Sequence, residues 1–264
     1  MFDLVLHGAD TYVGTGPRYP WGGLYGGQIV AQALRAASNT IDDDKTVHSL
    51  RAYFIRRGDA AEPVRYEVDR IRNGRSFSTR RVVARQAIGA ILNLEASYQR
   101  SERSALVQPV RMPDVPGASD LEESTWSADF DRRFVAEGDT PPPAMGTGRM
   151  VAWMRVTAPL PDGTEDADLL HRCWLAYLSD DLPCDSVVRA HPRRATIEGA
   201  DGRFIASLDH SVWFHAPPRV DAWHLYDVSC LAHAGGRGLA LGQAFSEDGT
   251  HVATFAQEAL VREP

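Results

Sequence analysis

Alternating hydrophobic and polar positions dominate residues 47–99. Val64, Tyr66 and Val68 alternate with charged residues, which is the two-residue period of a half-buried strand. Asn73-Gly74 separates this run from the next, and Asn-Gly between two such runs is a strong hairpin signal. Further strands are predicted over residues 47–54, at 82–83 and over 88–98, so the stretch reads as an antiparallel meander.

One helical stripe comes just before the meander. Over residues 27–38 the apolar side chains recur at helical spacing: Ile29, Val30, Ala33, Leu34 and Ala37. A single helix followed by a meander predicts an α+β layer in which the sheet wraps the helix. Gly26 and Gly27 would let a ligand approach the backbone N–H groups at the helix start, although a tight turn explains them equally well.

The same organisation returns after a stretch rich in proline and acidic side chains, residues 104–148. This stretch is predicted to be a linker with a short helix near 127–137. A second stripe predicts a helix over 166–178, and strands are predicted over 150–159, 206–214, 223–230, 239–245 and 251–261. Internal repetition therefore predicts two helix-plus-sheet units, 1–103 and 149–264, which pair into one continuous sheet with the helices on one side or back to back.

The two copies differ at positions that can carry chemistry. Matching the His-Ser dipeptides at 48 and 210 sets Asp209 against Val47, and matching the last strands sets Gln257 against Ser97. A buried aspartate is rare unless it is paired or functional. A hydrogen-bonded Asp209 that only caps a strand or turn is the alternative, but the asymmetry favours one functional site in the second half.

Composition excludes several classes of protein. The net charge of −7 disfavours nucleic acid as a partner. Three cysteines without CxxC spacing disfavour a disulfide framework or a structural zinc site, and no metal site is expected. No signal peptide or long apolar run is seen, so a cytoplasmic protein without membrane insertion is expected. The absence of a GxSxG motif disfavours a serine hydrolase of the α/β type.

Five segments resemble the acyl-CoA thioesterase II (TesB-like) family. They are GGLYGGQIVAQALRAA (22–37), VHSLRAYFIRRGD (47–59), RIRNGRSFSTRRVVARQ (70–86), LDHSVWFH (208–215) and HVATFAQEALVR (251–262). They span nearly the whole chain outside the linker, in the family's order and spacing. The resemblance implies a double hotdog fold, hydrolysis of acyl-CoA to free acid and CoA, no cofactor, a place in fatty acid metabolism, and a homo-oligomer, dimer or tetramer.

The same resemblance implies the site residues. The family's catalytic Asp and Gln fall on Asp209 and Gln257, which would hold a water between them with Asp209 as general base. Direct attack by Asp209 to give an anhydride stays open. The backbone N–H groups of Gly27 and Gln28 would receive the thioester oxygen.

The family's third site residue is a Thr or Ser, and this sequence departs from that pattern. Leu231 stands at its place, and Ser229, two residues away on the same strand face, could substitute only if the strand register shifts. The departure leaves a non-catalytic or weakly active acyl-CoA-binding protein as the alternative function.

Overall fold

The structure is a computed structural model that describes the whole chain except residues 43, 106, 144, 162–164, 194–203 and 263–264. The N-terminal half contains β1 (Val5–Leu6), β2 (Thr11–Gly14), α1 (Gly26–Ser38), β3 (Lys45–Phe54), β4 (Val64–Asn73), β5 (Phe77–Gln86) and β6 (Gly89–Arg100). The rest contains β7 (Phe130–Phe134), β8 (Thr147–Val156), α2 (Glu165–Leu178), α3 (Pro183–Ala190), β9 (Phe204–Ser207), β10 (Asp209–Phe214), β11 (His224–Ala234), β12 (Arg237–Ser246) and β13 (His251–Arg262). Short 3₁₀ turns lie at Ala118–Asp120 and Glu137–Asp139.

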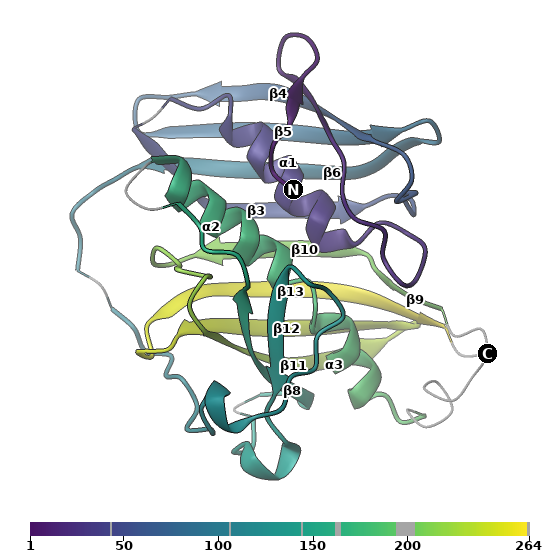
Figure 1. Cartoon of the computed structure of the whole chain (residues 1–264), viewed down its shortest axis with the longest axis vertical. Coiled ribbons are helices and arrows are strands. Elements are labelled where there is room, and N and C mark those ends of the chain that lie inside the picture. The colour runs from purple at the N-terminus through teal and green to yellow at the C-terminus, as the bar shows by residue number, and fades with distance from the viewer. Residues whose placement is uncertain (43, 106, 144, 162–164, 194–203, 263–264) are drawn as a thin grey trace.

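The described strands form one antiparallel sheet, as the repeat predicted. Its order is β1-β2-β4-β5-β6-β3-β10-β13-β12-β11-β8-β7, with β9 paired to β13. The two halves meet where β3 pairs with β10 at the centre of the sheet (Figure 1). Both long helices lie on the same face of this sheet and contact each other, which decides between the two helix arrangements left open by the sequence.

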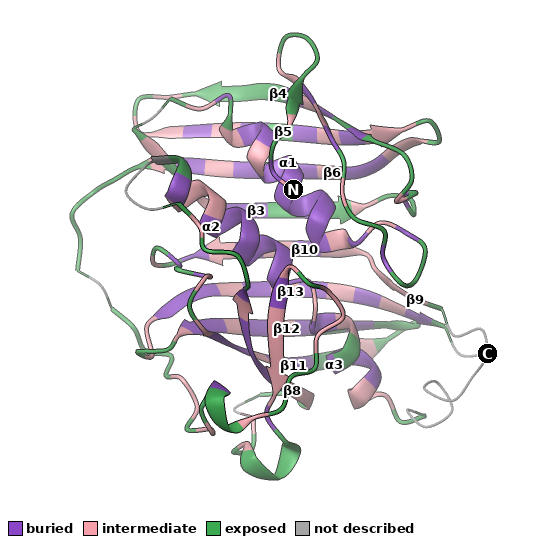
Figure 2. Ribbon diagram, in the orientation of Figure 1, coloured by how far each residue is buried: buried purple, intermediate pink, exposed green. Residues whose placement is uncertain are grey.

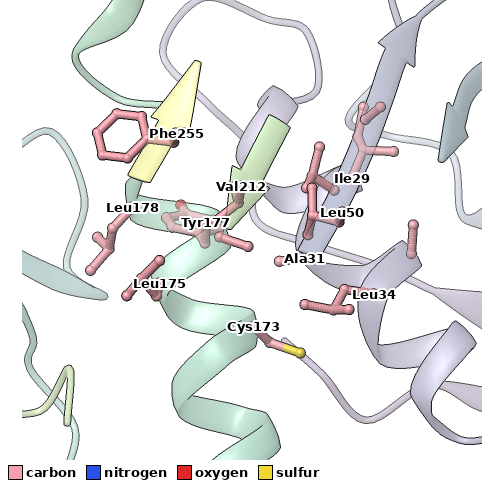
Figure 3. Packing of buried hydrophobic residues seen from close by; sticks show 14 of the residues in the cluster. Ile29, Ala31, Leu34, Leu50, Cys173, Leu175, Tyr177, Leu178, Val212 and Phe255 are labelled. Atoms are coloured by element: carbon pink, nitrogen blue, oxygen red, sulfur yellow. The ribbon is translucent and has the colours of Figure 1, made fainter. Parts of the chain in front are cut away.

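The helix α1 is buried on nearly all of its surface. Ten of the thirteen residues of α1 are buried (Figure 2). Figure 3 shows Ile29 and Leu34 of α1 and Leu175 of α2 among the side chains of the sheet, which include Leu50, Val212 and Phe255. Small residues such as Ala31 keep α1 thin enough to pack closely against its neighbours.

The pairing of β3 with β10 has a local two-fold symmetry that corrects the match made from the sequence. Tyr53 pairs with Asp209, and Ser49 pairs with Trp213. β3 ends at Phe54 and β10 at Phe214, and the next strands begin at Val64 and His224, so exchanging the two halves sets Asp209 against Ser49. The His-Ser dipeptides at 48 and 210 are two residues out of step, so the match of Asp209 with Val47 is wrong.

The same symmetry corrects the second match. His210 corresponds to Leu50, whose partner on β6 is Ala96. Gln257, which contacts His210, then corresponds to Ala96, and its match with Ser97 is wrong. Neither Ser49 nor Ala96 is an acid or an amide, so the asymmetry between the halves remains.

Residues 127–137 form a strand and its flanking turns, and the expected short helix is wrong. Phe130 and Phe134 are four residues apart, a spacing that suits one helical face and equally one face of a strand. Pairing of β7 with β8 decides for the strand, with Phe130 opposite Val156 and Phe134 opposite Ala152. The helix α3 was not expected from the sequence. Among the described residues, no helix has the length and apolarity needed to cross a bilayer.

Candidate functional site

The Gln257 amide is fully buried in the second half of the sheet and hydrogen-bonded at both ends. It projects from β13 toward the helices, on the same side as Phe255 and Ala259 of the core. Its Oε1 lies 2.6 Å from Nδ1 of His210, and its Nε2 donates to Oγ of Ser207 at 2.8 Å. The amide is thus held in one plane by two neighbouring strand segments.

These contacts continue into the C-terminal end of α2. Nε2 of His210 lies 2.8 Å from Oγ of Ser179, the first residue after the helix. The hydroxyl of Ser207 donates to Oδ1 of Asp180 at 3.4 Å. Because Ser179 and Asp180 are adjacent in sequence, the five side chains form a ring: Ser179, His210, Gln257, Ser207 and Asp180. We call this set the Gln257 ring.

Asp180 brings a buried carboxylate to this ring. Its residue is 5% exposed, and burial raises the pKa of the carboxyl to about 7. A hydrogen bond from the backbone N–H of Gly27 and contacts from Gln257 and Ser207 oppose this rise, whereas the charge of Asp181 adds to it. The carboxyl therefore titrates in a range where catalytic acids and bases are found.

Two glycines let the C-terminal end of α2 approach the N-terminal end of α1. A Cβ on Gly26 would lie 2.6 Å from Oδ2 of Asp180, and a Cβ on Gly27 would collide with the carbonyl oxygen of Tyr177. The hydroxyl of Tyr25, just before α1, donates to that same carbonyl at 2.9 Å. The glycines are thus required for close packing, and the positive end of the α1 dipole points at the site.

The N-terminal turn of α1 holds the residues expected to bind an oxyanion. The first helical hydrogen bond runs from the Ile29 N–H to the Tyr25 carbonyl, so the N–H groups of Gly27 and Gln28 precede it. The Gly27 N–H contacts the Asp180 carboxylate. The side chain of Gln28 turns elsewhere and accepts a hydrogen bond from Tyr19.

Asp209 lies at a β-bulge beside the Gln257 ring. Ser207 pairs with Ala259 and Ser211 with Ala256, so the strand that carries Asp209 has one extra residue at this point. Oδ1 of Asp209 accepts the backbone N–H of Glu258, the residue after Gln257, at 2.7 Å.

Asp209 is half-buried, and burial raises the pKa of its carboxyl. The hydrogen bond from the Glu258 N–H partly opposes this shift, and the charge of Glu258 adds to it. The bulge therefore keeps a carboxylate with a raised pKa next to the Gln257 backbone.

Ser229 and Leu231 lie away from this group. Ser229 pairs with Leu241 on β12, one residue beyond the Cys230–Ala240 pair, and Ala240 in turn pairs with Gln257. Neighbours on a strand face opposite sides, so Ser229 and Gln257 leave the sheet on opposite faces. Leu231 lies in a bulge and is 38% exposed.

The opposite junction of the two helices, at the C-terminal end of α1, has a cavity but not the same chemistry. Its volume is about 430 Å³, and its lining includes Val47, Tyr98 and Arg172. In the first half, the positions that correspond to Asp209 and Gln257 carry Ser49 and Ala96. Among the residues that the structure describes, no three His, Cys, Asp or Glu side chains form a group able to hold a metal ion.

Sequence reasoning named Asp209 and Gln257 but missed Asp180 and Ser207. One signal for Asp180 was present, because Asp180-Asp181 follows directly on the apolar stripe of α2, and negative charge at a helix C-terminus is unfavourable. His210 entered the sequence analysis only as part of the His-Ser dipeptide at 210. Its contact with Gln257 depends on strand pairing and could not be read from the sequence.

Comparisons with known proteins agree with the resemblance in the sequence. The model of the acyl-CoA thioesterase N-terminal domain matches residues 15–99, and that of the acyl-CoA thioesterase C-terminal domain matches residues 108–261. Acyl-coenzyme A thioesterase 8 of Mus musculus is 35% identical, over 90% of this chain and 80% of its own length. Acyl-CoA thioesterase 2 of Haemophilus influenzae is 33% identical, over 90% of this chain and 87% of its own length.

Solved structures give the same picture. The crystal structure of an acyl-CoA thioesterase II, TesB2, from Mycobacterium marinum has a TM-score of 0.86 and 35% sequence identity, and covers 100% of this chain and 96% of that chain. A hot dog fold protein from Alicyclobacillus acidocaldarius, with a TM-score of 0.78 at 20% identity over 100% of this chain and 97% of that chain, supports the fold alone. The fold is a double hotdog, and the chain belongs to the acyl-CoA thioesterase family.

Proposed function

We propose that the protein hydrolyses acyl-CoA to a free acid and CoA, at the site formed by β10, β13 and the N-terminal end of α1. The observation that carries this proposal is the Gln257 amide, buried and held at both ends, next to Glu258, whose backbone N–H binds the half-buried Asp209 carboxylate. Relatives named acyl-CoA thioesterases at 33–35% identity support the substrate class. The cytoplasmic location and the homo-oligomer expected from the sequence stay predictions.

In the proposed reaction, Asp209 and Gln257 hold the attacking water. Asp209 accepts the proton as the water attacks the thioester carbon, and the CoA thiolate leaves. A carboxyl whose pKa is raised by burial is a stronger base than an exposed one, which suits this role. Ser229 is assigned no contact with the water, because it leaves the sheet on the other face.

The thioester oxygen becomes negatively charged during attack and needs hydrogen-bond donors. The N–H groups of Gly27 and Gln28 lie before the first helical hydrogen bond of α1, at the positive end of its dipole. Without substrate, the Gly27 N–H donates a hydrogen bond to the Asp180 carboxylate. This hydrogen bond would break when the thioester oxygen binds.

The test is free-thiol release from a panel of acyl-CoAs of different chain length. Wild type should release CoA, and Asp209→Asn should lower kcat by about 10²- to 10⁴-fold, the usual range for loss of a general base. Asp185→Asn, which removes an exposed carboxylate from α3, is the matched control and should behave as wild type. Equal release by wild type and Asp209→Asn would remove Asp209 from the mechanism.

The alternative function is a non-catalytic acyl-CoA-binding protein, because Leu231 occupies the family's Thr or Ser position. Binding of acyl-CoA to the wild-type protein, measured by calorimetry without any thiol release across the panel, would favour it. Hydrolysis of a single chain length by wild type rules it out.

A further inference from the structure

A second cavity, with a volume of about 630 Å³, lies at the C-terminal end of α3. Its lining comes from the end of α3, the β11–β12 hairpin and the end of β13: His191, Pro192, Arg193, His233, Ala234, Gly235, Gly236, Val261 and Arg262. We call it the α3 pocket. We propose that the α3 pocket binds the phosphate groups of CoA while the thioester lies at the proposed hydrolytic site.

The inference rests on the proposed function and deepens it, because it assigns a place to the part of the substrate that is remote from the reacting bond. Two arginines and two histidines line the α3 pocket, and among the residues that the structure describes no acidic side chain lines it. The whole chain has a net charge of −7, so this grouping of basic side chains is local. Arginine is the usual partner of phosphate, because its planar guanidinium donates parallel hydrogen bonds.

The helix α3 connects this pocket to the proposed hydrolytic site. Cys184 lies in its first turn, and Nε2 of Gln257 donates to the Cys184 Sγ at 3.6 Å. His191, directly after the last residue of the helix, lines the pocket. α3 has eight residues, so it spans about 12 Å between the two places. Along β13 the separation is similar, because Gln257 and Val261 are four residues apart, about 13 Å along a strand.

The pantetheine arm of CoA has the length that this separation requires. Between the sulfur and the first phosphorus it has about as many chain bonds as four residues of extended polypeptide, which span about 14 Å. Gln257 and Val261 are both buried, and their even spacing puts them on the same face of the sheet. A thioester beside Gln257 therefore allows the phosphates to reach the α3 pocket without crossing the sheet.

Hydrogen bonds fix the protons of the two histidines in the pocket. Nε2 of His233 lies 2.8 Å from the Val187 carbonyl oxygen, which only accepts, so this nitrogen carries a proton. Nδ1 of His191 accepts the backbone N–H of Arg193 at 3.1 Å, so the proton of the neutral His191 ring is on Nε2. The two rings meet edge to face, with centroids 5.1 Å apart. His191 therefore brings an N–H donor to the pocket, which suits an anionic ligand.

Helix stability explains only part of this group of basic side chains. Cations at the C-terminus of a helix are stabilising, which accounts for His191 and Arg193 at the end of α3. It does not account for His233 of β11 or for Arg262 at the end of β13. Basic side chains from separate elements line one cavity, and binding of an anion accounts for all of them.

Comparison of the two halves links the α3 pocket to the half that carries the proposed site. In the first half, β3 begins at Lys45, a short turn after α1 ends at Ser38. In the second half α3 lies between α2 and β9 and packs against β8, β11, β12 and β13 (Figure 1). The β11–β12 hairpin turns on Gly235 and Gly236, both with positive φ, so no side chain of this turn blocks the pocket.

The experiment compares thiol release from three thioesters of one acyl chain: acyl-CoA, acyl-dephospho-CoA, which lacks the 3′-phosphate, and acyl-pantetheine, which lacks every phosphate. The proteins are wild type, Arg193→Gln, Arg262→Gln and the double variant. Arg65→Gln, which removes an exposed arginine from β4, is the matched control. The double variant should raise KM for acyl-CoA by about 10- to 100-fold and leave kcat near the wild-type value, because the phosphates bind equally in the ground and transition states.

Acyl-pantetheine should be hydrolysed equally by wild type and the double variant. Arg262→Lys, which keeps the charge, should retain more affinity for acyl-CoA than Arg262→Gln. A double variant with an unchanged KM for acyl-CoA, or with the same loss on acyl-pantetheine, would overturn the inference and leave the hydrolysis intact. A loss confined to acyl-CoA assigns the pocket to the 3′-phosphate, and a loss shared with acyl-dephospho-CoA assigns it to the diphosphate.

Calorimetry with CoA alone tests the pocket without turnover. The double variant should bind CoA about 10- to 100-fold more weakly than wild type. If wild type releases no thiol from any of the thioesters, the proposed function fails, and the CoA titration alone decides the inference. Equal affinity of wild type and the double variant for CoA rejects it.

Discussion

Nδ1 of His210 lies 2.6 Å from Oε1 of Gln257, while its Nε2 lies 2.8 Å from the Ser179 hydroxyl. An amide oxygen only accepts, so Nδ1 carries the ring proton and Nε2 does not. Burial lowers the pKa of His210 to about 4, which keeps the ring neutral. Nitrogen NMR of the imidazole should therefore show the Nδ1–H tautomer unchanged between pH 5 and 8. A His210 titration near pH 6.5 would contradict the assigned hydrogen bonds.

Gly27→Ala should destabilise the protein. The new Cβ would collide with the Tyr177 carbonyl, a backbone atom at the end of α2 that cannot turn aside. Overpacking of this kind costs about 1–3 kcal/mol, so the thermal midpoint should fall by several degrees. Gly138→Ala is the control, because a Cβ there meets nothing within 4 Å. Equal midpoints for the two variants would mean that the helix ends are not packed this closely.

Asp180→Asn should stabilise the protein at alkaline pH. The folded chain keeps the Asp180 proton up to about pH 7, whereas the unfolded chain releases it near 3.8. Between these values the folded state binds more protons, so this group lowers the free energy of unfolding as pH rises. The full effect is on the order of 4 kcal/mol, reached above pH 7.

Thermal midpoints of wild type and Asp180→Asn at pH 5 and pH 8 check this prediction. At pH 8 the variant should have a higher thermal midpoint than wild type. The difference between the two midpoints should be smaller at pH 5, where the wild-type carboxyl is protonated. The same difference in thermal midpoint at both pH values would show that Asp180 does not titrate in the folded protein.

Asp181 should be needed to hold residues 104–148 onto the second unit. Its carboxylate accepts hydrogen bonds from Nε1 of Trp126 and Nη1 of Arg132, both at 2.6 Å, and the side chains of Arg132 and Asp181 are only 11% and 5% exposed. Removing one partner of a buried ion pair leaves an uncompensated charge, so Asp181→Ala should cost about 3–5 kcal/mol in urea unfolding.

The matched control for Asp181→Ala is Asp69→Ala, which breaks an exposed pair with Arg81 on neighbouring strands. Exposed pairs contribute about 0–1 kcal/mol, so this variant should unfold close to wild type. If both variants lose the same small amount, the contacts of Trp126 and Arg132 do not fix the linker.

Much of the fold could be predicted because its signals are local. The two helical stripes and the strand alternation specify elements whose bounds the structure reproduces closely, as in residues 166–178 for α2 (Glu165–Leu178). The repeat predicted a continuous sheet because neither unit can cover its own apolar face alone. The spacing of Phe130 and Phe134 did not predict strand β7, because it fits a helix as well as a strand. Pairing with β8 makes this segment a strand.

The sequence by itself determined that Asp209 and Gln257 are polar positions in otherwise apolar strands. Only the tertiary structure decided their register and their partners, because a bulge shifts strand pairing by one residue without any local signature. The same holds for Asp180. Its contact with Ser207, which binds Gln257, depends on how the end of α2 packs against the sheet. Packing between segments that are distant in sequence produces no periodic pattern of residues.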